Sequence, residues 1–157
     1  MNLGYACINT ALSSNGIMTN RTMRRKTFDA KGIDYVSDLS LLNVKDLKTI
    51  IQWNNEMGIK LFRLSSQIFP WSDEYNIKDL KDYNEICDLM LEIGNIAKDA
   101  GQRLTMHPGP YNCLASPTKK VVEKTIRELN FHSSQFDMMG YEPSPYNKIN
   151  IHVGGAY

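Results

Sequence analysis

The stretch NVKDLKTIIQWNNEMGIKLFRLSS, residues 43–66, holds an amphipathic helix followed at once by a short apolar strand. Asn43 is a residue type favoured at a helix N-cap, and Gly58 stands where a left-handed residue suits the helix C-terminus. Apolar residues recur at helical spacing between them: Val44, Leu47, Ile50, Ile51 and Trp53. We therefore predict a helix that begins after Asn43, and a strand over residues 59–66.

The same alternation of strand and helix extends to both sides of this unit. The predicted strands are residues 3–9, 59–66, 103–107 and 148–153. The predicted helices carry apolar stripes over residues 33–42, 44–53, 86–97 and 121–139. Gly101 and Gly140 stand where the last two helices should end, and Ser116 with Pro117 should open the last of them.

This order is β-α-β-α-β-α-β, the pattern of an α/β protein with a parallel sheet. No strand is followed by G-x-G-x-x-G or by a P-loop, so the nucleotide-binding folds lack their usual sequence support. A complete (β/α)8 barrel of the TIM type needs about 250 residues. We predict that residues 1–157 are one domain, the first four β/α units of such a barrel, a half barrel.

Composition excludes several classes of protein. The 157 residues include 18 basic and 17 acidic side chains and 42% apolar residues, as in an ordinary globular domain. No apolar run is long enough to cross a membrane, and the polar N-terminus does not resemble a signal peptide. The odd set of Cys7, Cys87 and Cys113, without a C-x-x-C pair, fits a reducing compartment. We expect an intracellular protein, in the cytoplasm or nucleus, that is neither secreted nor bound to a membrane.

Two histidines end predicted strands. His107 lies in RLTMHPGPY and His152 lies in INIHVGGAY. Neighbouring parallel strands are about 4.8 Å apart, so imidazoles at equivalent ends can converge on one cation. Hydrogen bonds to backbone carbonyls explain the two residues equally well. His132, within the last apolar stripe, is better explained as a helix-surface or core histidine than as a ligand.

Cationic side chains form a local cluster, although the net charge of +1 gives the chain no overall field for nucleic acid. The cluster consists of Arg21, Arg24, Arg25 and Lys26 on the first loop, with Arg63 at the end of the second strand. Guanidinium groups fork onto phosphate oxygens, so these residues are candidates for DNA-backbone contacts. A solvated charged face is the simpler explanation of so short a run.

Aromatic and amide side chains also gather at the predicted strand ends: Tyr5, Asn9, Trp71, Tyr111 and Asn112. Exposed rings can stack on unpaired bases, and amides can read base edges. Core packing would account for Tyr5 and Trp71 as well.

An ordered series of motifs is more specific than any of these patterns. It comprises LGYACIN (3–9), RTMRRKTF (21–28), NVKDL (43–47), FRLSS with IFP (62–70), RLTMHPGPY (103–111), RELNFH (127–132) and INIHVGGAY (149–157). In order and spacing, the series resembles the ultraviolet-damage endonuclease family over essentially the whole chain.

The resemblance implies a DNA repair enzyme, a β/α-barrel nuclease that nicks double-stranded DNA on the 5′ side of ultraviolet photoproducts, both pyrimidine dimers and 6-4 products. It implies a cluster of divalent metal ions, manganese in particular, that activates the attacking water. His107 and His152 match family metal ligands. Tyr5, Asn9 and Tyr111 match residues that face damaged DNA. No catalytic residue can be assigned from this chain.

The chain departs from the family pattern in three places. Pro110 replaces the glutamine that usually precedes the lesion-probing aromatic residue, here Tyr111. No histidine follows the FP of the second loop, and Trp71 stands near that position. The family's carboxylate ligands and catalytic lysine belong to strands five to eight, so we expect the rest of the gene product or another chain to supply them.

Other functions stay open at this point. An inactive half-barrel fragment or an interaction module would need no further ligands. An apurinic-site endonuclease or a sugar isomerase of the same barrel type would share strand-end histidines, although LGYACIN argues against both. We also expect the isolated chain to self-associate or to stay partly unfolded, because the first and fourth strands would leave unpaired sheet edges.

Overall fold

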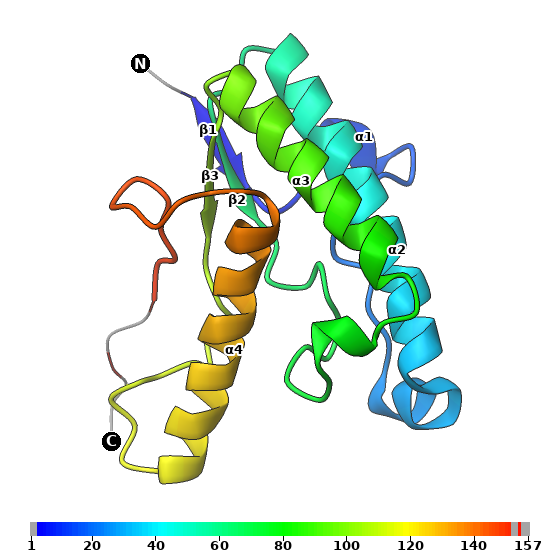
Figure 1. Cartoon of the computed structure of the whole chain (residues 1–157), viewed down its shortest axis with the longest axis vertical. Coiled ribbons are helices and arrows are strands. Elements are labelled where there is room, and N and C mark those ends of the chain that lie inside the picture. Colours follow the sequence, from blue (N-terminus) through cyan, green and yellow to red (C-terminus); the bar gives the residue numbers. More distant parts are fainter. Residues whose placement is uncertain (1–2, 152–153, 155–157) are drawn as a thin grey trace.

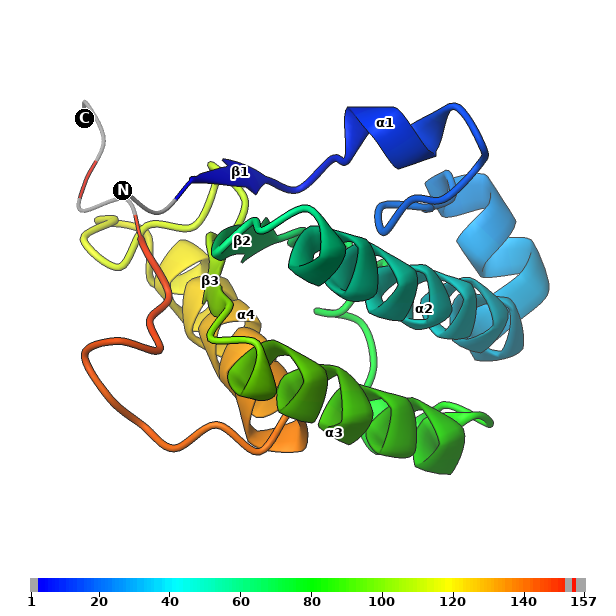
Figure 2. The same ribbon diagram turned by 90° about the horizontal axis from the view of Figure 1, so that it is seen from above.

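The computed structural model describes residues 3–151 and residue 154. It is an α/β structure whose elements are β1 (Gly4–Ala6), α1 (Thr10–Ser13), α2 (Arg25–Glu56), β2 (Leu61–Leu64), η1 (Ile77–Asp79), α3 (Tyr83–Asp99), β3 (Arg103–Met106) and α4 (Lys119–Met138). The strands form a parallel sheet in the order β1-β2-β3. Helices α2 and α3 lie side by side against one face of this sheet, and α4 packs next to α3 (Figures 1 and 2).

The register of the strands separates two faces of the sheet. Tyr5 pairs with Phe62, and Phe62 pairs with Leu104, so these side chains share the face that the helices cover. We call this the core face; its fully buried members are Phe62, Leu64, Leu104 and Met106. The opposite face, which we call the open face, carries Gly4, Ala6, Leu61, Arg63, Arg103 and Thr105.

The helices complete the core above the core face. Burial against the sheet involves Val44, Leu47, Ile50 and Ile51 of α2, Ile86, Met90 and Ile93 of α3, and Phe136 of α4. Gly94 lies where α3 meets the end of α4, because a β-carbon there would collide with the carbonyl of Met139. The absence of a side chain at Gly94 therefore sets how closely the two helices approach.

The first two predicted helices are one helix, so the expected N-cap at Asn43 is wrong. The irregularity lies earlier, at Gly32, whose φ of 66° interrupts α2. Asn43 is fully buried within α2, where its Oδ1 accepts the N–H of Arg21 at 3.1 Å and its Nδ2 donates to the carbonyl of Ile68 at 3.0 Å. Its amide binds two loops to the helix instead of capping a helix end.

The other boundaries agree more closely with the sequence pattern. Gly58, Gly101 and Gly140 have φ values of 69°, 62° and 67°, which confirms the predicted left-handed residues after the helices. Helix α4, in contrast, begins at Lys119 with Thr118 at its N-cap, so Ser116 and Pro117 lie in the preceding loop.

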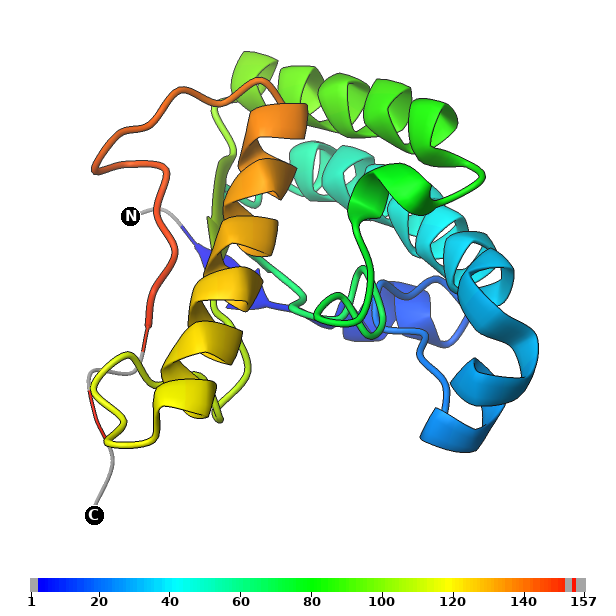
Figure 3. The same ribbon diagram turned by 60° about the horizontal axis from the view of Figure 1, so that its bottom comes forward.

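The predicted fourth strand is represented by a single parallel bridge in the described part of the chain. Ile149 pairs with Met106, and the N–H of Asn150 donates to the carbonyl of Met106 at 2.9 Å. The segment that leads to this bridge runs along β3 on the side away from α2 (Figure 3). Among the described residues, no helix combines the length and the apolar character that a membrane span requires.

Candidate nucleic-acid interface at the carboxyl ends of the strands

Three loops extend from the carboxyl ends of the parallel strands: residues 7–24 after β1, 65–82 after β2 and 107–118 after β3. Ligands of parallel α/β sheets bind at this end. A pocket of about 220 Å³ opens between the second and third loops, with Trp71, Gly109 and Glu128 in its lining. Cys7 and Trp71 have φ values of 61° and 57°, and such strained backbone is concentrated at functional sites.

Tyr5 and Asn9 are part of a hydrogen-bond network inside the chain. Asn9 donates from Nδ2 to the Tyr5 hydroxyl at 2.7 Å, and that hydroxyl donates to Asn54 Oδ1 at 2.6 Å. Asn9 also caps α1 by accepting the N–H of Leu12 at 3.0 Å. Burial raises the pKa of Tyr5, against the opposing effect of these hydrogen bonds. Both residues thus have a structural role, and their contact with damaged DNA stays a prediction.

Sequence reasoning missed the inner part of this network. Asn54 is fully buried and donates from Nδ2 to Gln102 Oε1 at 3.0 Å, which links the end of α2 to the start of β3. Gln102 in turn donates to Asn55 Oδ1 at 2.6 Å. The only sequence signal was a pair of amides directly after an apolar stripe, a pattern that equally describes an exposed helix end.

Arg21 is held by groups of its own chain. Its guanidinium pairs with Asp46 at 2.6 Å and donates to the carbonyls of Met18 and Gly16, each at 2.7 Å. The side chain is only 24% exposed. Arg21 therefore fixes the first loop to α2, and its expected phosphate contact stays a prediction.

Arg25 is also engaged, although it is exposed. It pairs with Asp29 at 2.8 Å and with Glu74 at 2.9 Å, and these hydrogen bonds raise its pKa. Its guanidinium lies 5.4 Å and 5.5 Å from the ring centres of Phe28 and Trp71. Arg25, predicted to lie on the first loop, is the first residue of α2 and thus connects that helix to the second loop.

Arg24 and Lys26 differ from their neighbours in the cluster. Both are exposed, and neither forms an ion pair within the part of the chain that the structure describes. Their positive charges are therefore available to an external anion. The four cations between residues 21 and 26 thus divide into two that organise loops, Arg21 and Arg25, and two that face solvent, Arg24 and Lys26.

Trp71 packs against the first loop instead of standing free. Its indole Nε1 donates to the carbonyl of Met23 at 3.1 Å, and its ring lies 5.6 Å from that of Phe28. Arg63, on the open face, keeps a buried Nε that has no hydrogen-bond partner among the described residues. Both stay candidates for contact with a ligand.

The turn after β3 carries His107 and Tyr111. His107 follows β3 directly and is half-buried, and Tyr111 is 91% exposed at the tip of the turn. Asn112, expected beside Tyr111 as a reader of bases, is instead 5% exposed and donates from Nδ2 to the carbonyl of Gly109 at 3.1 Å. His152 lies outside the described residues, so its convergence with His107 stays a prediction.

Helix α4 supplies a carboxylate to this turn that sequence reasoning missed. Glu128 Oε1 accepts the N–H of Gly109 at 3.3 Å and lies 3.5 Å from Nε2 of His132. Burial alone would raise the pKa of Glu128, but the neighbouring polar groups of His132, Asn112 and Gly109 outweigh it and hold that pKa below its usual value. His132 is 1% exposed, which confirms that it is a core histidine of α4.

Metal-binding groups are sparse in the described part of the chain. Within residues 3–151 and 154, no three His, Cys, Asp or Glu side chains gather closely enough to hold a metal ion. One imidazole, that of His107, does not make a site for a divalent cation. The described residues therefore do not fit a resident metal by themselves.

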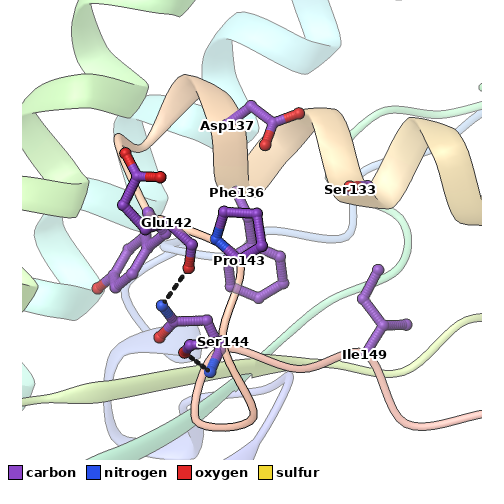
Figure 4. A pocket seen from close by; sticks show the side chains of 9 residues that line it. Ser133, Phe136, Asp137, Glu142, Pro143, Ser144 and Ile149 are labelled. Atoms are coloured by element: carbon purple, nitrogen blue, oxygen red, sulfur yellow. Dashed lines mark hydrogen bonds between the residues drawn. The ribbon is translucent and has the colours of Figure 1, made fainter.

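A second pocket, of about 270 Å³, lies between α4 and the segment that follows it (Figure 4). Its lining includes Ser133, Phe136, Asp137, Glu142, Pro143, Ser144 and Ile149. Asn147 closes the loop by donating to the carbonyl of Glu142 at 2.9 Å. None of these residues belongs to the three loops at the carboxyl ends of the strands.

The model of the family described as UV-endonuclease UvdE matches residues 1–157. The chain belongs to this family. A putative UV-damage endonuclease of Acanthamoeba polyphaga mimivirus is 39% identical over 156 residues, and the UV-damage endonuclease of Schizosaccharomyces pombe is 35% identical over 164. A solved structure described as "Crystal Structure of SacUVDE" superposes on 99% of the chain with a TM-score of 0.84 and 30% identity.

The UvdE relatives are longer than this chain. The chain spans 47% of the mimiviral relative, 26% of the fission-yeast relative and 50% of the solved structure. In each case almost all of the chain, 99%, takes part in the match.

Proposed function

We propose that residues 1–157 form the front half of a (β/α)8 barrel that nicks DNA on the 5′ side of ultraviolet photoproducts. The observation that carries the proposal is the turn after β3. In a chain of the UvdE family, this turn presents Tyr111, 91% exposed, four residues after the strand-end His107. An exposed ring on a turn held by α4 is suited to filling the space that a distorted base pair leaves.

Charge at the same end of the sheet supports contact with a DNA backbone. Arg24 and Lys26 are exposed cations free of internal ion pairs among the described residues, and Arg63 has an unpartnered Nε on the open face. These side chains would bind phosphates without regard to sequence or damage. Tyr111 would then provide the preference for a lesion, without the glutamine that Pro110 replaces.

The metal requirement belongs to the same proposal. Manganese or another divalent ion would activate water for phosphodiester hydrolysis, and His107 and His152 would each supply an imidazole. Oxygen ligands would have to come from beyond the described residues, in the second half of the barrel. Because the described residues do not complete the site, we derive no catalytic step for it.

Replacement of His107 tests the proposal. We expect His107→Ala, made in a protein of the relatives' full length, to abolish manganese-dependent nicking of irradiated duplex DNA, because a lost ligand removes metal. The far-ultraviolet circular dichroism and the unfolding midpoint should not change, since His107 is only half-buried. Unchanged nicking in manganese would refute the assignment.

A non-catalytic role is the second candidate, and the absence of a three-donor group among the described residues around His107 favours it. An inactive fragment or interaction module would bind irradiated DNA, or a partner protein, without cutting. Irradiated, apurinic and intact duplexes tested in parallel separate the possibilities. Cleavage of apurinic DNA alone would favour a different barrel nuclease, and binding without cleavage of any duplex would favour the module.

A further inference from the structure

Helix α4 approaches the turn after β3 through one carboxylate. Glu128 Oε1 accepts the backbone N–H of Gly109 at 3.3 Å, and the Glu128 side chain is 17% exposed. Gly109 lies midway between His107 and Tyr111 in the sequence. A single hydrogen bond from α4 thus reaches the centre of the segment that carries both candidate site residues.

The carbonyl of Gly109 also has a hydrogen-bond partner. Asn112, 5% exposed, donates from Nδ2 to the carbonyl of Gly109 at 3.1 Å. The next residue, Cys113, donates its N–H to Oγ1 of Thr125 on α4 at 3.0 Å. The turn is therefore fixed to α4 at two points, Glu128 and Thr125, while Tyr111 between them remains exposed.

Buried polar residues stand behind Glu128. His132 and Gln135 are each 1% exposed, and with Glu128 they are four and three residues apart on one side of α4. Gln135 Nε2 lies 3.1 Å from Nδ1 of His132. If the amide donates, the imidazole proton is on Nε2, which lies 3.5 Å from Glu128 Oε1.

Burial of such groups is costly unless they interact with one another or with the backbone. In this arrangement Gln135 orients His132, and His132 faces the carboxylate that receives the Gly109 N–H. The 3.5 Å between His132 Nε2 and Glu128 Oε1 is long for a hydrogen bond. The imidazole therefore stabilises the Glu128 carboxylate mainly through its dipole. Glu128 reaches the predicted DNA surface through Gly109, whereas His132 and Gln135 are buried, and core packing alone would favour apolar residues at His132 and Gln135.

We propose that Glu128 is a positioning residue: with His132 and Gln135 behind it, it holds the 107–112 turn so that Tyr111 is preorganised for a DNA lesion. This inference rests on the proposed function. Preorganisation lowers the entropy that the turn loses on binding, so its absence should weaken lesion recognition without removing any DNA contact.

Hydrogen exchange of the Gly109 amide tests the contact itself. We expect Glu128→Ala to speed this exchange on the order of tenfold, because the amide loses its acceptor. Glu128→Gln should restore most of the protection, since its amide oxygen still accepts. Glu123→Ala, the same change at an exposed site on α4, should leave Gly109 unaffected. Unchanged exchange in Glu128→Ala would overturn the proposal.

A double-mutant cycle with Tyr111→Ala tests whether Glu128 affects lesion recognition through Tyr111. In the full-length protein, Glu128→Ala should lower the preference for irradiated over intact duplex about fivefold to tenfold, and this loss should vanish when Tyr111 is already alanine. If Glu128→Ala lowers this preference by the same factor whether residue 111 is tyrosine or alanine, the positioning role would be overturned. Should Glu128→Ala fail to fold, Asn112→Ala releases the other side of Gly109 and should give the same coupling.

The two proposals fail in different ways. If Tyr111→Ala binds irradiated DNA as tightly as the parent protein, the lesion-probe function is wrong, and the positioning role of Glu128 is wrong with it. If Tyr111→Ala weakens binding but the Gly109 amide exchanges at the parent rate in Glu128→Ala, only the positioning role is wrong.

Discussion

The two faces of the sheet differ sharply although they alternate along the same strands. On the core face, Phe62 and Leu64 are fully buried beneath α2 and α3. On the open face, Gly4 and Ala6 are exposed, Leu61 and Arg63 are half-buried, and only Thr105 of the residues named on that face is buried. The described residues thus build one complete interface, between sheet and helices, and leave the other face of the sheet without a covering layer.

This difference separates stability from binding. Residues on the core face contribute to the free energy of folding through apolar burial. The second loop also buries Ile68, Phe69 and Leu80 in the core, but the open face contributes little buried apolar surface, so the side chains there are available to a ligand or to another part of a barrel. A parallel sheet normally has both faces covered, which supports the proposal that further β/α units belong to the working enzyme.

The largest expected effect comes from a matched pair of leucines in β2. Leu64→Ala should lower the free energy of unfolding by about 2–5 kcal/mol, because Leu64 is fully buried on the core face. Leu61→Ala, the same change on the open face, should cost less than about 1 kcal/mol in the isolated chain. Urea unfolding of the parent and both variants at one fixed chain concentration, where any self-association is the same for all three, compares the two losses. Equal losses would show that the open face is packed as tightly as the core face.

Tyr111 should contribute to DNA binding and hardly to stability, the reverse of Leu64. Tyr111→Ala should weaken binding to irradiated duplex by about 1–3 kcal/mol, leave binding to intact duplex nearly unchanged, and hardly alter stability. Tyr146, another exposed tyrosine, lies on the segment after α4 and provides the control. Titration of both variants with both duplexes measures the difference. Equal losses on the two duplexes would reject a role in lesion recognition.

The smallest effect should distinguish two arginines of the first loop. Arg24→Ala should flatten the dependence of log K on log salt by about one unit on any duplex, because it removes one phosphate contact. Arg21→Ala should change stability instead, since Arg21 is bound to Asp46 and to backbone carbonyls. Salt titrations of both variants measure the slopes. A flatter slope in Arg21→Ala but not in Arg24→Ala would show that Arg21, and not Arg24, contacts phosphate.

The sequence predicted the parts of the fold that depend on local pattern. The order of strands and helices and the glycines after helices follow from periodicity and from the sterics of positive φ, as at Gly58 and Gly101. The continuous helix through Asn43 could not be predicted in this way, because the Asn43 amide binds the backbone of two loops that are distant in sequence. Local capping rules contain no information about such partners.

The sequence predicted which types of side chain belong to the site, but not which partners those side chains contact. His107 and Tyr111 were identified by a motif, whereas Glu128 appeared as one charge on an amphipathic helix. Its role depends on Gly109, a partner 19 residues away. The cationic cluster likewise divided once Asp46 and Glu74 were in place, and neither partner is adjacent to the cluster in sequence.

A nicking assay of the purified 157-residue chain on ultraviolet-irradiated duplex DNA in manganese, with light scattering on the same sample, tests whether these residues are half of an active site. We expect no nicks, and a chain that self-associates or stays partly unfolded because the described residues leave the open face and the sheet edges uncovered. A folded, monodisperse monomer that cuts irradiated DNA would contradict this expectation, because the chain would then hold a complete active site.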